Sequence, residues 1–159
     1  MNAIDELFQA VDANDRMAVE RLLRQQPQLQ TGARRERRTP LHAAVEKSMA
    51  TTVLALLQHG SELNARVDAA VGTADPRTGY TALHLAVERG NRQILELLLA
   101  QPALDMGART PDGESAVRLA EQSMRPALAD MILERIERSR PAPSPSRAER
   151  GLGTSERRR

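Results

Sequence analysis

The hydrophobic positions of the chain form one pattern that appears twice in its middle. Residues 39–45 combine a threonine, alanines and spaced leucine and valine, and an apolar segment follows at residues 53–57. The same order returns at residues 81–87 and 94–99, with the second threonine 42 residues after the first. Apolar residues at helical spacing in segments this short predict pairs of short amphipathic helices. Self-similarity of this kind predicts a solenoid of stacked repeats.

Weaker copies of the pattern flank these two, one starting near Asp5 and one near Asp112. Alanines 10, 44, 86 and 120 occupy equivalent places, at spacings of 34, 42 and 34 residues. Degenerate outer copies are expected, because terminal repeats present one face to water. The pattern therefore predicts an all-α repeat solenoid within residues 1–138. Its four repeats are expected at residues 4–33, 37–66, 79–108 and 112–137.

The two central copies open with Thr39-Pro40-Leu41-His42 and Thr81-Ala82-Leu83-His84. This opening resembles that of the ankyrin repeat, a β-turn followed by two antiparallel helices. The resemblance covers residues 4–137 and implies turns that project as fingers along one edge of the stack. It also implies binding of another protein along the concave face made by the fingers and the first helices.

Caps and turns support the same register. A threonine, serine or aspartate side chain can accept from the free amides of a helix's first turn. The expected N-caps are Asp5, Thr39, Thr81 and Ser115. Positive φ is expected between the two helices of each repeat, at Asn14, Ser48, Gly90 and Met124. Leu41, Leu56, Leu83 and Leu98 are expected to be buried between the layers.

The 42-residue spacing places about nine extra residues between Asn64 and Thr81. They lengthen the second finger, which contains the apolar residues Val67 and Val71 and ends at Tyr80, the only tyrosine. This composition predicts a partner contact with Tyr80 as its anchor, since aromatic residues are enriched at interface hot spots. The alternative is a tolerated surface insertion.

The first finger is strongly basic, with four arginines in residues 34–38. It is either a solvated loop or an electrostatic contact for an acidic partner. Nucleic acid is a weaker alternative, because few aromatics are present for stacking on bases. The resemblance implies partner contacts at the matching motif positions Arg38, Glu46, Tyr80, Glu88 and Glu114. The composition of the first two fingers adds Arg34, Arg35, Arg37, Val67, Asp68, Val71, Asp75 and Arg77 as expected partner-binding residues.

Composition narrows the class of protein. The 159 residues contain no cysteine, one lysine and 22 arginines, and the arginine bias suggests a GC-rich, bacterial coding sequence. No N-terminal signal or membrane-spanning run is seen, so a cytoplasmic location is expected, with secretion by a route that needs no N-terminal signal as the alternative. The protein in isolation is expected to be a monomer. Residues 138–159 carry seven arginines against two glutamates, and the Pro- and Ser-rich tail at 139–159 is expected to be disordered.

Candidate catalytic chemistry is sparse. His42 and His84 occupy turn positions of the repeat, and His59 precedes a glycine at a helix end, so all three are interpreted as structural. No cluster at metal-ligand spacing and no nucleotide-binding fingerprint is present, so no catalytic residue, metal or cofactor is expected. The sequence predicts a non-enzymatic binding module. Narrower alternatives are a secreted bacterial effector that engages a host protein and a cytosolic immunity protein that masks a toxin.

Overall fold

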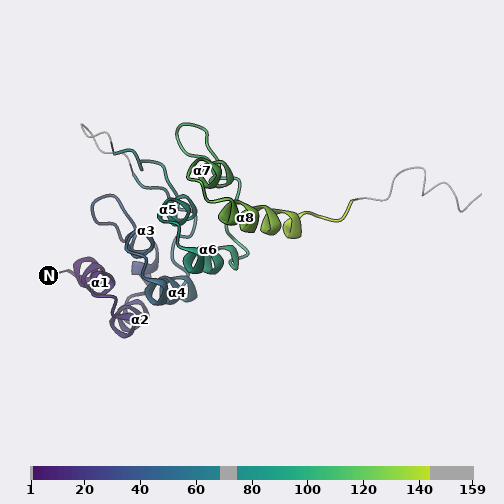
Figure 1. Ribbon diagram of the computed structural model, residues 1–159. Coiled ribbons are helices and arrows are strands. Elements are labelled where there is room, and N and C mark those ends of the chain that lie inside the picture. The colour runs from purple at the N-terminus through teal and green to yellow at the C-terminus, as the bar shows by residue number, and fades with distance from the viewer. Residues whose placement is uncertain (1, 69–74, 144–159) are drawn as a thin grey trace, which may run out of the picture.

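The computed structural model describes residues 2–68 and 75–143, which fold into four helix pairs (Figure 1). The first helices of the pairs are α1 (Ala3–Asp12), α3 (Pro40–Glu46), α5 (Ala82–Arg89) and α7 (Ala116–Gln122). The second helices are α2 (Arg16–Gln25), α4 (Ala50–Gln58), α6 (Arg92–Leu99) and α8 (Pro126–Ser139). A 3-10 helix, η1 (Pro27–Gln30), follows α2. The predicted all-α repeat solenoid is confirmed.

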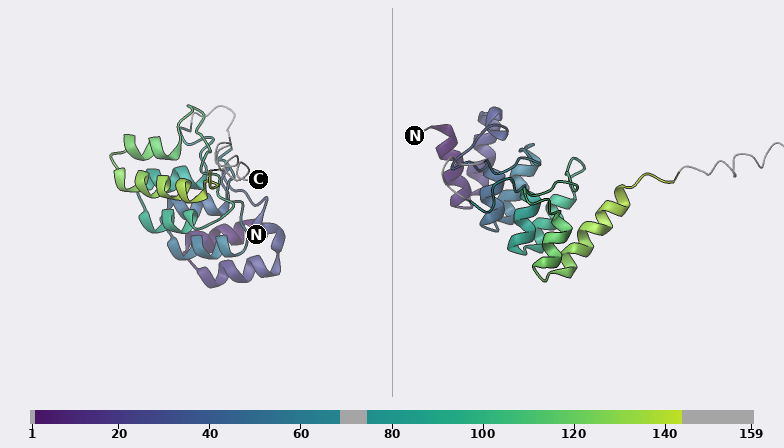
Figure 2. Two further views of the ribbon diagram at one scale, coloured as in Figure 1. Left: turned by 90° about the vertical axis from the view of Figure 1, so that its right-hand side faces the viewer. Right: turned by 90° about the horizontal axis from the view of Figure 1, so that it is seen from above.

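The helices lie in two layers, with α1, α3, α5 and α7 in one and α2, α4, α6 and α8 in the other (Figures 1 and 2). Each helix packs against its own pair partner and against its counterpart in the next repeat. The connections that lead into α3, α5 and α7 project beyond the first-helix layer as fingers (Figure 1). Side chains far apart in the chain therefore come together on the finger side.

One continuous core runs through all four repeats. The alanines at the repeating position are buried, with exposed fractions of 7% at Ala10 and 0% at Ala44, Ala86 and Ala120. A side chain this small lets neighbouring helices approach closely, and larger residues fill the space on either side. The leucines predicted to lie between the layers are buried at Leu41, Leu56, Leu83 and Leu98.

Most of the predicted helix starts are confirmed. Thr39 accepts a hydrogen bond from the amide of His42 at 3.2 Å, and Pro40 follows at the first helical position. Ser115 accepts from the amide of Arg118 at 3.3 Å. Each of these side chains satisfies one of the free amides that a helix start leaves without an intrahelical partner.

Two helix boundaries differ from the sequence prediction. The cap of α1 is Asn2, whose side chain accepts from the amide of Asp5 at 2.8 Å, so the prediction of Asp5 as a cap is wrong. Asn is as good a cap as Asp, and capping at Asn2 lets the helix start a turn earlier. The fourth repeat was expected to end at residue 137, but its second helix extends to Ser139. Residues 134–138 are good helix formers, which explains the extension.

Each turn histidine hydrogen bonds to the backbone at the start of its own helix, and His42 also contacts the connection that leads into the next repeat. His42 Nδ1 accepts from the amide of Thr39 at 3.1 Å, and its Nε2 lies 2.9 Å from the carbonyl oxygen of Ala65, to which it donates. His84 repeats the first contact, since its Nδ1 accepts from the amide of Thr81 at 3.2 Å. Burial lowers the pKa of His42 to about 4 and also lowers the pKa of His84. Both histidines are therefore neutral structural groups.

The four residues between paired helices all have positive φ, as predicted: 54° at Asn14, 58° at Ser48, 70° at Gly90 and 58° at Met124. In each repeat the turn between the two helices passes through this left-handed residue. Glycine and asparagine adopt it readily, whereas Ser48 and Met124 carry a steric penalty.

Gly90 has a second role that the sequence did not reveal. The guanidinium of Arg125 lies against it and donates to the carbonyls of Val87 and Glu88 at 2.8 and 2.5 Å. A Cβ at Gly90 would lie 2.7 Å from Arg125 Nε. Gly90 thus lets the fourth repeat cap the end of α5, where a cation interacts favourably with the helix dipole.

The strain at Met124 predicts that Met124→Gly stabilises the protein. The side chain is 87% exposed, so its removal sacrifices little packing. Relief of the left-handed strain should exceed the entropy cost of glycine, for a gain of about 0.5–1 kcal/mol in the free energy of unfolding. Urea denaturation measures it. Glu121→Gly, an exposed control inside α7, should lose a similar amount, and a loss at both positions would contradict the strain assignment.

Protonation of His42 predicts an acid sensitivity above the range in which carboxylates titrate. The unfolded chain takes up the proton near pH 6.5 and the folded chain near pH 4, so stability is full above pH 6.5 and falls as pH drops toward 4. From pH 7 to pH 5 the free energy of unfolding should fall by about 2 kcal/mol on this account.

His42→Gln is the matched control for that measurement. It keeps a polar side chain but cannot titrate, so the loss between pH 7 and pH 5 should shrink, although the variant is less stable at pH 7. An unchanged pH dependence in His42→Gln would show that other groups cause the acid sensitivity.

Candidate partner-binding surface

The finger face consists of the fingers at residues 34–38, 67–68 with 75–80, and 109–115, together with the adjoining exposed sides of the first helices. The first finger is a tight hairpin in which Arg35 and Arg38 exchange two backbone hydrogen bonds of 3.0 Å. Its tip residues Glu36 and Arg37 have φ of 50° and 68°, the geometry of a type I′ turn. Both are non-glycine residues in the left-handed region, so the turn carries a steric penalty that the contacts around it must offset.

The base of the second finger is also hydrogen bonded. The amide of Val67 donates to the carbonyl of Tyr80 at 2.9 Å, and the amide of Gly79 donates to the carbonyl of Val67 at 2.8 Å. The finger then turns at residues 75–78, where the Asp75 side chain accepts from the amide of Arg77 at 2.9 Å. The two sides of this finger are thus fixed to one another at the stack.

Val67 requires a correction. Its side chain is 2% exposed and belongs to the core, so the prediction that it contacts a partner is wrong. The strand-like pairing with Tyr80 and Gly79 turns the Val67 side chain inward. Val71, also predicted as a contact, and residues 144–159 of the predicted tail lie outside the described residues.

Five predicted site residues form a connected ion-pair row between the second and third repeats. Arg38 contacts Asp75 at 2.9 Å and Glu46 at 3.0 Å. Arg77 contacts Glu46 at 3.4 Å and Glu88 at 3.0 Å. The row therefore runs from finger to helix in the order Asp75, Arg38, Glu46, Arg77, Glu88. Its side chains are 14–35% exposed, which makes it a partly buried network rather than isolated surface pairs.

Two members of the ion-pair row, Asp75 and Arg77, have shifted pKa values. The amide of Arg77 and then the Arg38 guanidinium hold the pKa of Asp75 below its usual value. The hydrogen bond to Glu88 raises the pKa of Arg77. Both directions favour the charged forms of Asp75 and Arg77.

Further ion pairs connect the first finger to its neighbours on the finger face. Arg34 contacts Glu62 at 3.3 Å and Asp68 at 3.4 Å, which ties the first finger to the start of the second. Arg35 contacts Asp12 at 2.6 Å, and its guanidinium lies 4.6 Å from the centre of the Phe8 ring. A cation over an aromatic face is held there by the electrostatics of the ring.

Tyr80 and Glu114 lie farther along the finger face. The Tyr80 ring is half-buried against His84, with 5.6 Å between ring centres. Burial raises the pKa of its hydroxyl, with the Glu88 carboxylate as a second cause. No described residue forms a hydrogen bond with that hydroxyl. Glu114 accepts from Gln122 at 2.6 Å and lies 3.9 Å from Arg118.

The finger face is an open contact surface with one small hollow among its described residues. A hollow of about 140 Å³ lies between the first two repeats, lined by residues that include Phe8, Ala43 and Lys47. Across the described ranges, no three His, Asp or Glu side chains are grouped to hold a metal ion. None of the described helices is long and apolar enough to cross a membrane.

The chain is similar to parts of several known proteins, and three of these partial relatives are described next. The chain is 35% identical over 98 residues to neurogenic locus notch homolog protein 4 of Homo sapiens, which covers 62% of this chain and 4% of that protein. It is 30% identical over 101 residues to Rabankyrin-5 of Mus musculus, and this match covers 64% of this chain and 8% of that protein. It is 32% identical over 85 residues to poly [ADP-ribose] polymerase tankyrase of Caenorhabditis elegans, and this match covers 48% of this chain and 4% of that protein.

The chain thus spans less than a tenth of the length of each of these relatives. The family model for ankyrin repeats, described as three copies, matches residues 7–110. Ankyrin repeats are protein–protein interaction modules and are typically not enzymes. The match covers most of the first three helix pairs and the finger that leads to the fourth, and the chain belongs to the ankyrin repeat family.

Proposed function

We propose that this chain binds another protein on the finger face and that it is not an enzyme. The observation that carries the proposal is the ion-pair row, because it joins residues up to 50 positions apart, from Arg38 to Glu88, into one ordered polar surface. Side chains that are already ordered lose less entropy on binding than free ones do. A bacterial source and a cytoplasmic location belong to the same proposal.

The residues of the finger face divide by exposure into supports and contacts. Arg38 and Glu46 have side chains only 19% and 14% exposed and hold the row in place. Arg77 and Glu88 are 30% and 35% exposed, so one side of each faces outward. We place direct contacts on these outer residues and on the hydroxyl of Tyr80. Charge at such positions contributes more to partner choice and association rate than to final affinity.

A matched pair of charge reversals tests which layer of the stack binds. Arg118 on α7 borders the finger face, is 66% exposed and lies four residues from its partner Glu114. Arg92 on α6 lies in the other layer, is 69% exposed and lies four residues from its partner Glu96. The two substitutions change net charge equally at similar exposure. Arg118→Glu should weaken partner binding, and Arg92→Glu should not.

The measurement is quantitative capture of partners from the source cells on immobilised wild type and both variants. A protein retained by wild type and Arg92→Glu but lost by Arg118→Glu is the predicted outcome. Loss only with Arg92→Glu would place binding on the second helices and overturn the proposal. The identity of the partner also separates the two narrower roles, since an effector binds a host protein and an immunity protein binds a toxin.

Tyr80 provides a second test with little effect on folding. Tyr80→Phe retains the ring packed on His84 and removes only a hydroxyl that has no hydrogen-bond partner among the described residues. The free energy of unfolding should therefore stay within about 0.5 kcal/mol of wild type. Affinity for the captured partner should fall by about 0.5–1.5 kcal/mol if the hydroxyl donates across the interface. Calorimetric titration decides, and equal affinities would restrict Tyr80 to a structural role.

A further inference from the structure

The outer side of α8 carries exposed apolar residues at the end of the stack. Leu133 and Ile136 lie about one helical turn apart and have exposed fractions of 45% and 36%. The other large apolar side chains that stand out among the described residues are Met17 and Met124, and each stands alone. Terminal repeats usually present a polar outer face to water. A paired apolar patch in this position therefore indicates a surface that something covers.

A continuous depression follows this patch, here called the α8 groove. Its first part, about 620 Å³, is lined by Asp130, Leu133, Glu134, Ile136, Glu137 and Arg140. Its second part, about 310 Å³, shares Ile136 and Arg140 and is lined on its other side by the loop at residues 104–107. The groove has an apolar floor and a rim made mostly of carboxylates.

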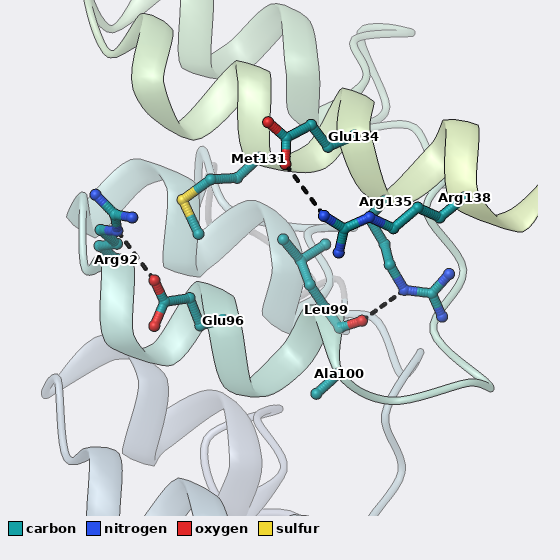
Figure 3. A pocket seen from close by; sticks show the side chains of 8 residues that line it. All are labelled: Arg92, Glu96, Leu99, Ala100, Met131, Glu134, Arg135 and Arg138. Carbon is teal, nitrogen blue, oxygen red and sulfur yellow. Dashed lines mark hydrogen bonds and ion pairs between the residues drawn. The ribbon is translucent and has the colours of Figure 1, made fainter.

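The rim carboxylates are incompletely neutralised within the described chain. Asp130 and Glu137 form no ion pair with any described residue. Glu134 lies 3.6 Å from Arg138, whose side chain extends along the α6 side of the helix (Figure 3). Asp105 accepts from the amide of Gly107, a neutral partner. The groove therefore presents net negative charge beside apolar surface.

The opposite side of α8 is anchored to the stack. Arg135 Nε donates to the carbonyl oxygen of Leu99 at the end of α6, at 2.7 Å (Figure 3). Ile132 is fully buried in the core. These contacts fix which side of α8 faces outward, so the α8 groove is a formed surface with a defined orientation.

We propose that the α8 groove binds an arginine-rich segment, and that its occupant is residues 144–159 of this same chain. That segment carries five arginines and two glutamates, with Leu152 as its one large apolar residue. Its charge complements Asp130 and Glu137, and Leu152 matches the apolar floor. The segment continues directly from Pro143, four residues after the end of α8.

The length of the segment permits this contact. Sixteen residues can span up to about 50 Å when extended. The fourteen residues of α8 are about 21 Å long. The segment can therefore turn back and run along the whole groove.

The tether determines how strong the contact must be. Exposed charge pairs are individually weak and are screened by salt. A short tether supplies an effective concentration in the millimolar range, so even weak intrinsic affinity populates the docked state. Docking is thus a salt-sensitive equilibrium on the rigid end of the stack. It involves no residue of the finger face and does not rest on the proposed partner binding.

Methyl NMR of the full chain and of a chain ending at Pro143 tests the proposal. At about 20 mM salt the Leu133 and Ile136 methyl signals should differ between the two proteins, and the difference should be lost at about 0.5 M salt. Leu7 and Leu23, in the first repeat, should show no difference. A synthetic peptide of residues 144–159 added to the shortened chain should restore the shifts of the full chain.

Charge-neutral variants provide the matched control. Asp130→Asn with Glu137→Gln keeps the shape of the groove and should abolish the shift difference. Glu6→Gln with Glu121→Gln makes the same net charge change at exposed sites elsewhere and should preserve it. Identical spectra of the full and shortened chains at low salt would overturn the proposal. So would shifts that grow with protein concentration alongside a dimer in sedimentation, which would assign the groove to a second copy.

Discussion

Stacking between neighbouring repeats is the interaction on which every other feature of this protein depends. The helices from α1 to α7 are 7–10 residues long, and helices of that length are unstable by themselves in water. They persist because the buried alanines of the first helices allow the neighbouring first helix to approach and the surrounding leucines are buried between the layers. No repeat has a core of its own, so stability and shape are properties of the stack rather than of any unit within it.

Polar contacts between repeats depend on the same register. Asn14 receives a hydrogen bond from Thr52 at 2.7 Å, and Asn64 bridges the backbone of Ala103 and Asp105 at 2.8 Å. Each contact joins residues 38–41 positions apart, close to one repeat. A slip of the stack would separate all of them at once. They therefore add specificity to an apolar core that by itself tolerates small displacements.

The sequence correctly predicts features that depend only on a few neighbouring residues. Capping by Thr39 and positive φ at Met124 follow from backbone geometry that a motif fixes. The ion-pair row was beyond such reasoning, because it depends on how two fingers of unequal length lean toward each other. Val67 shows the same limit: its apolar character was read as exposure on a finger, but the pairing with Tyr80 turns it inward. Arg125 over Gly90 was missed because a side chain from one repeat caps the helix of another.

The two ends of a stack differ in principle from its middle, because each lacks one neighbour. At the start of the stack, the exposed residues of α2 are charged or polar apart from Met17, so that face is well solvated by water. At the other end, Leu133 and Ile136 are exposed beside unneutralised carboxylates. Water solvates the carboxylates but not the apolar floor between them. A ligand that suits this face must therefore combine positive charge with a small apolar contact, which is the composition of the segment that follows α8.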